Sequence, residues 1–145
     1  MTRLMLSVCL CLLALLPVQA FAGPVEDASA VIDHWAVVFN ANDAEAVVKL
    51  YAPDALLHGT SSPKLNVGTD AIREYFKGLP GSGNTVTIGE RHMVALSDTA
   101  VMGVGFYQFS RPTVRPARFT FVIVKRGNDW VIAHHHSSAL PPPPQ

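Results

Sequence analysis

Two apolar stretches near the C-terminus predict a β-hairpin. β-Branched and aromatic residues dominate positions 118–125 and 130–138, and the turn-forming segment Arg-Gly-Asn-Asp at 126–129 separates them. Side chains alternate along a strand, so the first strand should place Phe119, Phe121 and Ile123 on one face and Val122 and Val124 on the other. Both faces are apolar, so we expect the helices of this chain to cover one and a second subunit to cover the other.

The same alternation divides the second strand of the hairpin. It predicts one face with Val131, Ala133, His135 and Ser137, and an opposite face with Trp130, Ile132, His134, His136 and Ser138. The expected partner is a second copy of the chain. The homodimer should form through the outer sheet face, with contact residues Trp130, Ile132, Val122 and Val124.

Three helical segments precede the long strands. Residues 25–40 carry apolar side chains at the spacing of one helical face, namely Val25, Ala28, Ile32, Trp35 and Phe39. Asp43 should cap a second, short helix that Tyr51 closes, and a turn at Pro53-Asp54 should lead into a short strand over 55–59. Thr69 or Asp70 should cap a third helix over 71–77.

Two more long strands are expected over 85–96 and 99–110. In the first, one face should hold Val86, Ile88, Glu90, His92, Val94 and Leu96, with Gly89 as a candidate bulge. The order is three helices around one short strand, followed by four long antiparallel strands, or α-α-β-α-β-β-β-β. We therefore predict an α+β fold in which a curved, cone-shaped antiparallel sheet wraps around three helices and encloses one pocket.

The N-terminus has the pattern of a secretory signal peptide. A basic start at 1–3, an apolar run at 4–16 and a small-x-small site at 20–22 predict cleavage after Ala22. The apolar run is too short to span a bilayer. We expect a periplasmic or secreted domain over 23–140, outside the membrane, followed by a proline-rich tail over 141–145.

Charge and cysteine content narrow the function classes. Both cysteines fall within the predicted signal peptide, so the mature domain has no thiol for a disulfide, a metal or a nucleophile. The formal net charge is +0, without a basic patch for nucleic acid. No glycine-rich phosphate motif or nucleotide fingerprint occurs, so no cofactor is expected. The expected partners are a small, largely neutral molecule and another copy of the chain.

Several motifs resemble the nuclear transport factor 2-like superfamily, which includes SnoaL-like cyclases and ketosteroid isomerases. The chain is most similar to the association (hub) domain of calcium/calmodulin-dependent protein kinase II and its secreted bacterial relatives of the SgcJ/EcaC type. The motifs that carry this resemblance are 42–46 (NDAEA), 51–55 (YAPDA), 70–76 (DAIREYF), 116–121 (PARFTF) and 130–138 (WVIAHHHSS). The positions of the hub's pocket arginines carry Phe106, Phe121 and Ser137 here, so a carboxylate-binding site of that kind is not retained.

The resemblance implies a pocket lined by aromatic and polar side chains. Its expected ligand-binding residues are Trp35, Phe39, Tyr75, Phe106, Phe121 and Ser137. The candidate acid–base residues are His135, Tyr107 and His58, because a histidine has a pKa near neutrality and can move a proton. Asp33 beside His34 is the remaining dyad-like candidate, but adjacent helical residues diverge by about 100° and cannot both face one ligand.

The His134-His135-His136 run raises a metal alternative. His134 and His136 share one strand face and could provide two ligands to one metal, with His92 or His58 as a third. Packing at a subunit interface is the simpler interpretation, so we expect no metal.

Three functions follow from these observations. The first is a small exported homo-oligomer whose apolar pocket binds a small molecule. The second is an acid–base enzyme of the SnoaL or ketosteroid-isomerase type that acts on a small carbonyl compound. The third is an oligomerisation module without catalysis. The absence of a clearly placed acid in the pocket favours binding over catalysis.

Overall fold

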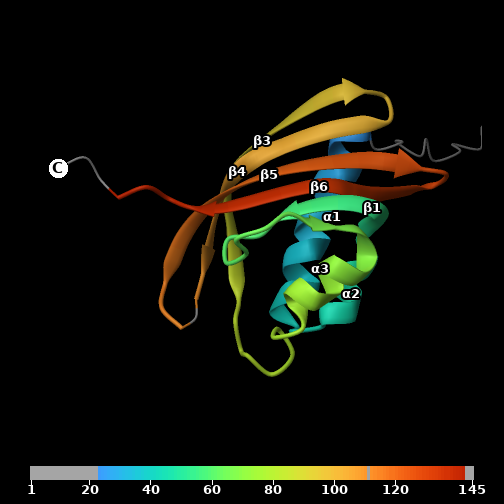
Figure 1. Ribbon diagram of the computed structural model, residues 1–145. Helices are drawn as coiled ribbons and strands as arrows, with labels where there is room; N and C mark the ends of the chain where they lie inside the picture. The colour runs from blue at the N-terminus through green and yellow to red at the C-terminus, as the bar shows by residue number, and fades with distance from the viewer. Residues whose placement is uncertain (1–22, 111, 143–145) are drawn as a thin grey trace, which may run out of the picture.

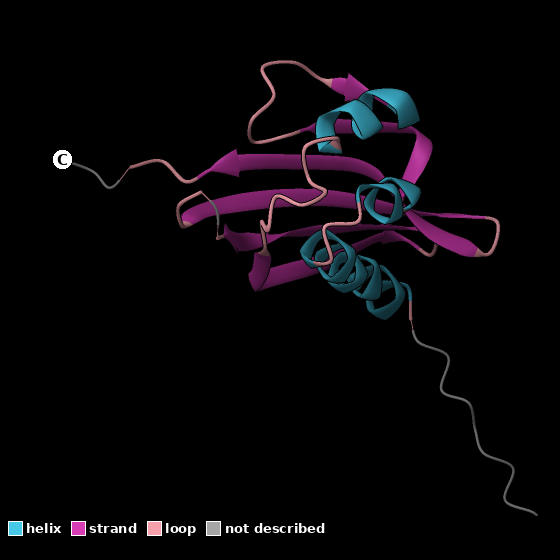
Figure 2. Cartoon of the chain, turned by 90° about the horizontal axis from the view of Figure 1, so that it is seen from below, coloured by secondary structure: helices cyan, strands magenta, loops and turns pink. Residues whose placement is uncertain are grey.

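One six-stranded sheet carries the three helices of the described chain on one side. The computed structural model describes residues 23–110 and 112–142. The elements are α1 (Pro24–Asn40), α2 (Ala44–Lys49), β1 (Tyr51–His58), β2 (Asn66–Val67), α3 (Gly68–Phe76), β3 (Val86–Ser97), β4 (Ala100–Phe109), β5 (Arg115–Arg126) and β6 (Asp129–Ala139). The strand order is β2-β1-β6-β5-β4-β3 (Figure 1). Figure 2, turned to look from below, shows the three helices lying over the strands. The predicted α+β fold is confirmed.

The first two helices form where the sequence predicts. Pro24 occupies the first turn of α1, where its missing N–H costs nothing, and Ile32 and Trp35 on the predicted face are buried. Asn42 then adopts φ 57° and turns the chain. Asp43 caps α2 because its Oδ1 accepts a hydrogen bond from the Ala46 N–H at 2.9 Å.

The third helix begins earlier than predicted. α3 starts at Gly68, whose φ of 77° suits glycine, and Val67 precedes it in an extended conformation without a side-chain cap. The predicted caps Thr69 and Asp70 are therefore wrong, since both residues already lie in the first turn. The Asp70 carboxylate instead accepts a hydrogen bond from Arg73 at 2.9 Å.

Strand β1 corrects two further predictions. Tyr51 does not close α2 but begins β1, and Pro53-Asp54 lies within that strand rather than in a turn. β1 runs parallel to β6, with Tyr51 opposite Ile132, whereas the other strand pairs are antiparallel. The Ile132 N–H donates to the Leu50 carbonyl at 2.8 Å, which holds the start of β1 in register. The short strand β2, beside β1, was not predicted.

An extra residue in β6 breaks the predicted alternation. Ile123 pairs with Ile132 and Val122 pairs with His134, so Ala133 has no opposite residue. Ile132 and His135 consequently both face the helices, and both are buried. His134 and His136 face the opposite side. The bulge thus brings Ile132 to the face of His135, and ordinary alternation beyond it puts His134 and His136 on the other face.

The same bulge changes which of the residues expected at the dimer contact lie on the outer face. Ile132 is fully buried in the core of its own chain. The Trp130 Nε1–H donates to the Asp27 carboxylate of α1 at 3.2 Å, so this ring also lies on the helix side. Of the four expected contact residues, Val122 and Val124 remain on the outer face, where both are half-buried.

A second bulge divides the predicted face of β3. Ile88 pairs with Tyr107 and Arg91 pairs with Gly105, which leaves two residues of β3 opposite one of β4. Val86 is buried and Ile88 half-buried on the inner face, but Glu90, His92, Val94 and Leu96 all lie exposed on the outer face. The bulge predicted at Gly89 therefore lies at the right place. The prediction that all six residues share one face of β3 is wrong.

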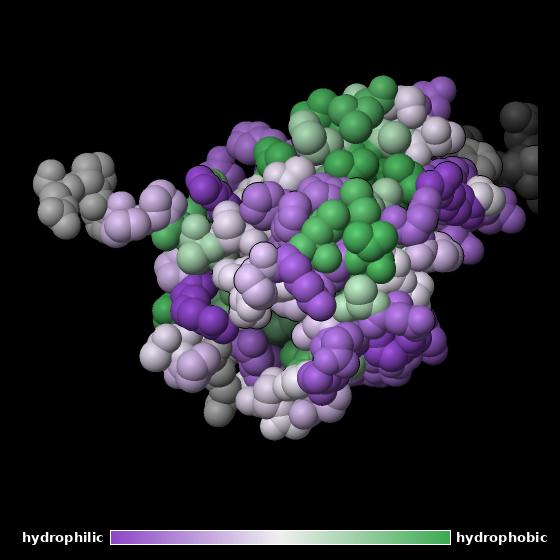
Figure 3. All heavy atoms as spheres, in the orientation of Figure 1, coloured by the Kyte–Doolittle hydropathy of each residue, from purple (hydrophilic) through white to green (hydrophobic). Residues whose placement is uncertain are grey.

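The outer sheet face exposes a band of apolar side chains. The large ones that are exposed are Leu56, Val67, Val94, Leu96 and Phe106, and the sheet between them carries half-buried Met102, Val104, Val122 and Val124. Figure 3 shows apolar side chains gathering over the β3–β4 end of the sheet at the top of the view. In the described part of the chain, no helix is both long enough and apolar enough to cross a membrane.

Candidate functional site

A cavity of about 620 Å³ lies between the sheet and the helices. Helix α1 contributes Trp35 and Phe39, α3 contributes Tyr75 and Phe76, and strand β4 contributes Tyr107 to its aromatic lining. These rings pack on one another, and Trp35 stacks on Phe39 with centroids 5.1 Å apart. The walls are thus aromatic and held by mutual contacts, as in a preformed ligand pocket.

Polar groups gather at one end of this cavity. His135 and Ser137, two residues apart on β6, both line it, and Thr60 joins them from the loop after β1. The Thr60 and Ser137 hydroxyls are hydrogen-bonded to each other. The Tyr107 phenol lies near enough to both hydroxyls that they lower its pKa, against the larger effect of burial, which raises it. Four polar side chains therefore meet at one end of a space whose walls are largely aromatic.

Behind this polar end, a series of hydrogen bonds leads into the core. The Trp35 Nε1–H donates to the Tyr51 hydroxyl oxygen at 3.1 Å. The Tyr51 hydroxyl is 2.8 Å from His135 Nδ1, and His135 Nε2 is 3.4 Å from the Tyr107 hydroxyl oxygen. The His135 ring also stacks on Phe121 with centroids 3.9 Å apart. One face and both nitrogens of His135 are thus in contact with other side chains.

Burial keeps this site neutral. The pKa of His135 is lowered to about 3, first because burial disfavours the imidazolium and then because His134 and His136 lie nearby. Burial likewise raises the pKa of the Tyr107 and Tyr51 hydroxyls. At neutral pH an uncharged imidazole and the protonated Tyr107 phenol therefore line the cavity, and the protonated Tyr51 phenol lies behind them.

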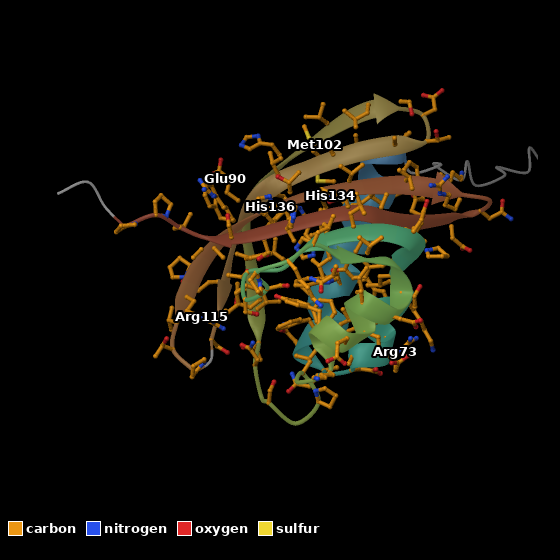
Figure 4. The ribbon with its side chains drawn as sticks, viewed as in Figure 1. Arg73, Glu90, Met102, Arg115, His134 and His136 are labelled. Carbon is orange, nitrogen blue, oxygen red and sulfur yellow. The ribbon has the colours of Figure 1, made fainter. Side chains whose placement is uncertain are left out.

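No Asp or Glu in the described part of the chain lines the cavity. Asp33, the dyad-like candidate, instead forms a two-pronged ion pair with Arg91 of β3 at 2.6 and 2.8 Å. Arg115, at the start of β5, is the charged residue on the described lining, and Figure 4 labels it at the end of the strand. The site thus holds hydroxyls and an imidazole but no carboxylate base.

Most predicted ligand-binding residues lie at the cavity. Trp35, Phe39, Tyr75 and Ser137 all line it. Phe121 is fully buried behind His135 and supports that ring without lining the cavity. Phe106 was predicted to bind the ligand, and this prediction is wrong because its side chain is 49% exposed on the outer sheet face. Its neighbour Tyr107 faces inward instead.

The structure separates the three proposed acid–base residues. His135 and Tyr107 come together at the cavity, but His58 is exposed on the outer sheet face. His58 pairs with His136 across β1 and β6, and its ring centroid is 5.7 Å from that of His136 and 6.5 Å from that of His134. His58 therefore cannot act with His135 on one ligand in the cavity.

The outer histidines lie on the face away from the helices, where Figure 4 labels His134 and His136. Partial burial lowers the pKa of His134, and the neighbouring His136 and His58 add to this effect. No group of three or more His, Cys, Asp or Glu side chains within residues 23–110 and 112–142 is arranged to hold a metal ion.

Sequence reasoning missed Tyr51 and Thr60. Tyr51 was interpreted as the end of a helix because the parallel pairing of β1 with β6 has no local signal. Thr60 lies in a loop, where side-chain direction does not follow any period. The motif 51–55 does draw attention to Tyr51, but only the structure shows that its hydroxyl contacts His135.

Comparisons with known proteins agree with this architecture. The model of a family described as SnoaL-like domain matches residues 28–142. A solved structure from Xanthomonas campestris, provisionally described as a calcium/calmodulin-dependent protein kinase II association domain, is 30% identical, with a TM-score of 0.75 over 88% of this chain and 94% of that one. No match was found among curated protein sequences.

Two further solved structures share the fold. An NTF2-like protein from Shewanella oneidensis is 26% identical over 79% of this chain and 98% of that one, with a TM-score of 0.69. A ketosteroid isomerase-like protein from Erwinia carotovora is 22% identical over 84% of this chain and 100% of that one, with a TM-score of 0.62. The second likeness is a likeness of fold alone.

Proposed function

The chain belongs to the family of SnoaL-like domains, and from that premise we propose that it binds a small, largely apolar molecule in the cavity between its sheet and helices. The observation that supports this function is the combination of aromatic walls with a few polar groups at one end. Ligand pockets of this size have that composition, since apolar walls supply affinity and a few polar groups fix orientation.

An acid–base enzyme is the second candidate, because His135 and Tyr107 adjoin at the cavity. Two observations make it weaker than binding. A histidine whose pKa lies near 3 is a poor proton acceptor at neutral pH. A carboxylate that could take its place is also missing from the described lining. The polar end is better suited to orienting a ligand than to moving a proton.

We propose in addition that two copies pair through the outer sheet face. The apolar side chains of this face come from the five strands β1 to β5, and five of the large ones are exposed in the single chain. Exposed apolar surface of this kind on a sheet favours association. A second copy is the proposed occupant because a face that combines exposed apolar side chains with Glu90 and the outer histidines can pair with itself about a two-fold axis.

Export is the third part of the proposal. It rests on the signal-peptide pattern of residues 1–22, which lie outside the described residues. The proposed protein is thus a dimeric, exported binding protein with one pocket per subunit.

Binding can be tested with isopropylbenzene as an apolar probe of the cavity. We expect saturating isopropylbenzene to raise the melting temperature, because a ligand that binds only the folded state stabilises it. Ala139→Trp, at an exposed lining position, should remove the shift by filling the cavity mouth. Ala95→Trp is the matched control, since Ala95 is exposed on β3 and does not line the cavity.

Native mass spectrometry of the protein purified from its own cells provides an independent check. A retained organic mass, absent from Ala139→Trp, is the expected result. The proposal would be contradicted if isopropylbenzene left the melting temperature unchanged and the protein carried no added mass.

A further inference from the structure

We propose that pH controls the pairing of two copies, because three neighbouring histidines on the outer sheet face become charged in mild acid and then place unpaired charge in the interface. This control rests on the proposed pairing through that face and adds its regulation. Its basis is the position of His58, His134 and His136 among the side chains of the sheet.

An apolar row crosses the outer face from β2 to β3. The backbone register aligns Val67 of β2, Leu56 of β1, His134 of β6, Val122 of β5, Met102 of β4 and Val94 of β3. Every member of this row is apolar except His134, which is half-buried in the single chain. Two copies that pair through the apolar row therefore cover His134 as well.

A second row runs beside it and contains the other two histidines. His58 and His136 lie opposite each other on β1 and β6, and the row continues through Thr120 and Val104 to His92. It lies two residues, or about 7 Å, further along β6. A row across six strands is about 24 Å long at a strand spacing of about 4.8 Å. An interface of about 800 Å² per copy therefore spans several rows and includes this one.

The three histidines form one cluster on this face, on the side of the sheet where Figure 4 labels His134 and His136. The ring centroid of His58 is 5.7 Å from that of His136 and 6.5 Å from that of His134. The pKa of His134 is lowered first by partial burial and then by His136 and His58. The neutral form of His134 is thus favoured in the single chain, and further burial acts in the same direction.

The strands beside this cluster bring apolar and positive side chains to it. Besides one another, the residues opposite the three histidines are Leu56, Val122 and Thr120. Arg118, two residues before Thr120 on the same face of β5, adds a positive charge and donates from Nε to the Ser138 hydroxyl at 3.1 Å. Protons on the cluster therefore add to a charge of the same sign.

The carboxylates of the neighbouring outer strands have other partners. Glu90 is 3.2 Å from Nε2 of His92 at the β3 end of the sheet. Asp54, earlier on β1, is 3.6 Å from Arg126. Neither pair includes a histidine of the cluster. A second copy brings an identical face, so two protonated faces repel each other.

Paired copies consequently bind fewer protons than separate ones. The association then weakens as the pH falls through the range in which histidine titrates. For a histidine of ordinary pKa, about 6.5, exclusion of one proton from each subunit raises the dissociation constant about 100-fold between pH 7.5 and 5.5. Pairing is therefore strongest at neutral pH and above.

Analytical ultracentrifugation at pH 7.5 and 5.5 tests this control. We expect the dissociation constant of the wild type to rise about 100-fold at the lower pH. The triple variant His58→Gln/His134→Gln/His136→Gln cannot titrate at these positions and should stay paired at both. It retains His135, so it also controls for a loss of folded protein in acid. His34→Gln, at an exposed position of α1, is the matched single control and should behave as the wild type.

A permanent charge should imitate acid at neutral pH. We expect His136→Lys to be monomeric at pH 7.5, because a buried unpaired charge is costly, and His34→Lys to pair as the wild type does. EDTA at pH 7.5 should leave the pairing unchanged. Dissociation by EDTA would assign the histidines to a bound metal ion and overturn the proton-controlled pairing.

The outcomes separate this control from the proposed pairing. A wild type that pairs equally at both pH values would overturn the control and leave the pairing in place. A triple variant that dissociates in acid as the wild type does would also overturn it. A wild type that is monomeric at pH 7.5 would remove the pairing itself, and the pH control with it.

Discussion

At the scale of single residues, the fold uses three consecutive histidines in two ways. His134 and His136 lie on the outer sheet face, while His135 is only 2% exposed and stacks on Phe121. Burial lowers the pKa of His135 to about 3, so the side chain provides a fixed dipole rather than a titrating group near pH 7. Its role is to connect Tyr51 with Tyr107.

The depressed pKa of His135 predicts a specific loss of stability in acid. A histidine in the unfolded chain has an ordinary pKa of about 6.5, so between pH 6.5 and 3 the unfolded state binds this proton first. The stabilisation is thus present above pH 6.5 and is lost as the pH falls. This residue alone should contribute a slope of up to about 1.4 kcal/mol per pH unit to the free energy of unfolding. His134 contributes with the same sign.

Urea unfolding between pH 7 and 4 measures that slope. His135→Gln keeps a polar side chain but cannot titrate, so its stability should depend less steeply on pH than that of the wild type. His34→Gln replaces an exposed histidine of α1 and serves as the control. An equal change of slope in both variants would show that His135 is not the residue responsible.

At the scale of the elements, two bulges determine which side chains reach the cavity. The one in β6 brings Ile132 and His135 to the same face, and the one in β3 sends Glu90 outward after Ile88. The β3 bulge is held closely against β4. A Cβ on Gly105 would lie 2.5 Å from the Glu90 carbonyl oxygen and 2.9 Å from the Arg91 Cα.

Gly105→Ala should therefore destabilise the protein. The clash is with backbone atoms that cannot rotate away, and overpacking of this kind costs about 1–3 kcal/mol. Gly78→Ala is the matched control, because a Cβ there would meet no atom within 4 Å. Denaturant midpoints of the two variants measure the difference. Equal stabilities would mean that β3 and β4 can separate at the bulge without cost.

Local patterns in the sequence predicted some of these elements and not others. The buried face of α1 follows from helical periodicity, and the cap at Asp43 follows from residue type. The inner face of β5 follows from strict alternation. The bulge at Ala133 has no such signal, because it arises where β6 pairs with β5 on one side and with β1 on the other.

The sequence likewise predicted only some of the residues of the candidate site. His135 and Ser137 are predicted on the cavity side by strand alternation and by the family resemblance, and both line the cavity because they lie beyond the bulge in β6. Phe106 was placed inside although its neighbour Tyr107 is the inward residue, an error of one position that reverses the face. His58 was placed inside because β1 was predicted without its partner strands. Long-range pairing, rather than residue type, accounts for what the sequence could not show.

At the scale of the whole molecule, the outer sheet face predicts self-association. Val122 lies at the middle of this face on β5, and Val122→Lys would place a charge in the proposed interface. We expect the wild type to sediment as a dimer and this variant as a monomer, because a buried unpaired charge is costly. Analytical ultracentrifugation over a range of concentrations measures the equilibrium.

The control for this experiment is Val37→Lys. Val37 is 63% exposed on α1, on the other side of the molecule, so the same change there should leave the dimer intact. A monomeric wild type, or equal loss of dimer in both variants, would contradict pairing through this face.

The position of β6 also sets the order in which the molecule can fold. Among the described strands this one comes last in the chain, yet it lies between β1 and β5 and joins the two halves of the sheet (Figure 1). Pairs such as His58 with His136 connect distant parts of the chain, and contacts of long sequence separation form slowly. The sheet therefore cannot be completed until β6 has been synthesised, and the export that we propose would act on a chain whose sheet is still open.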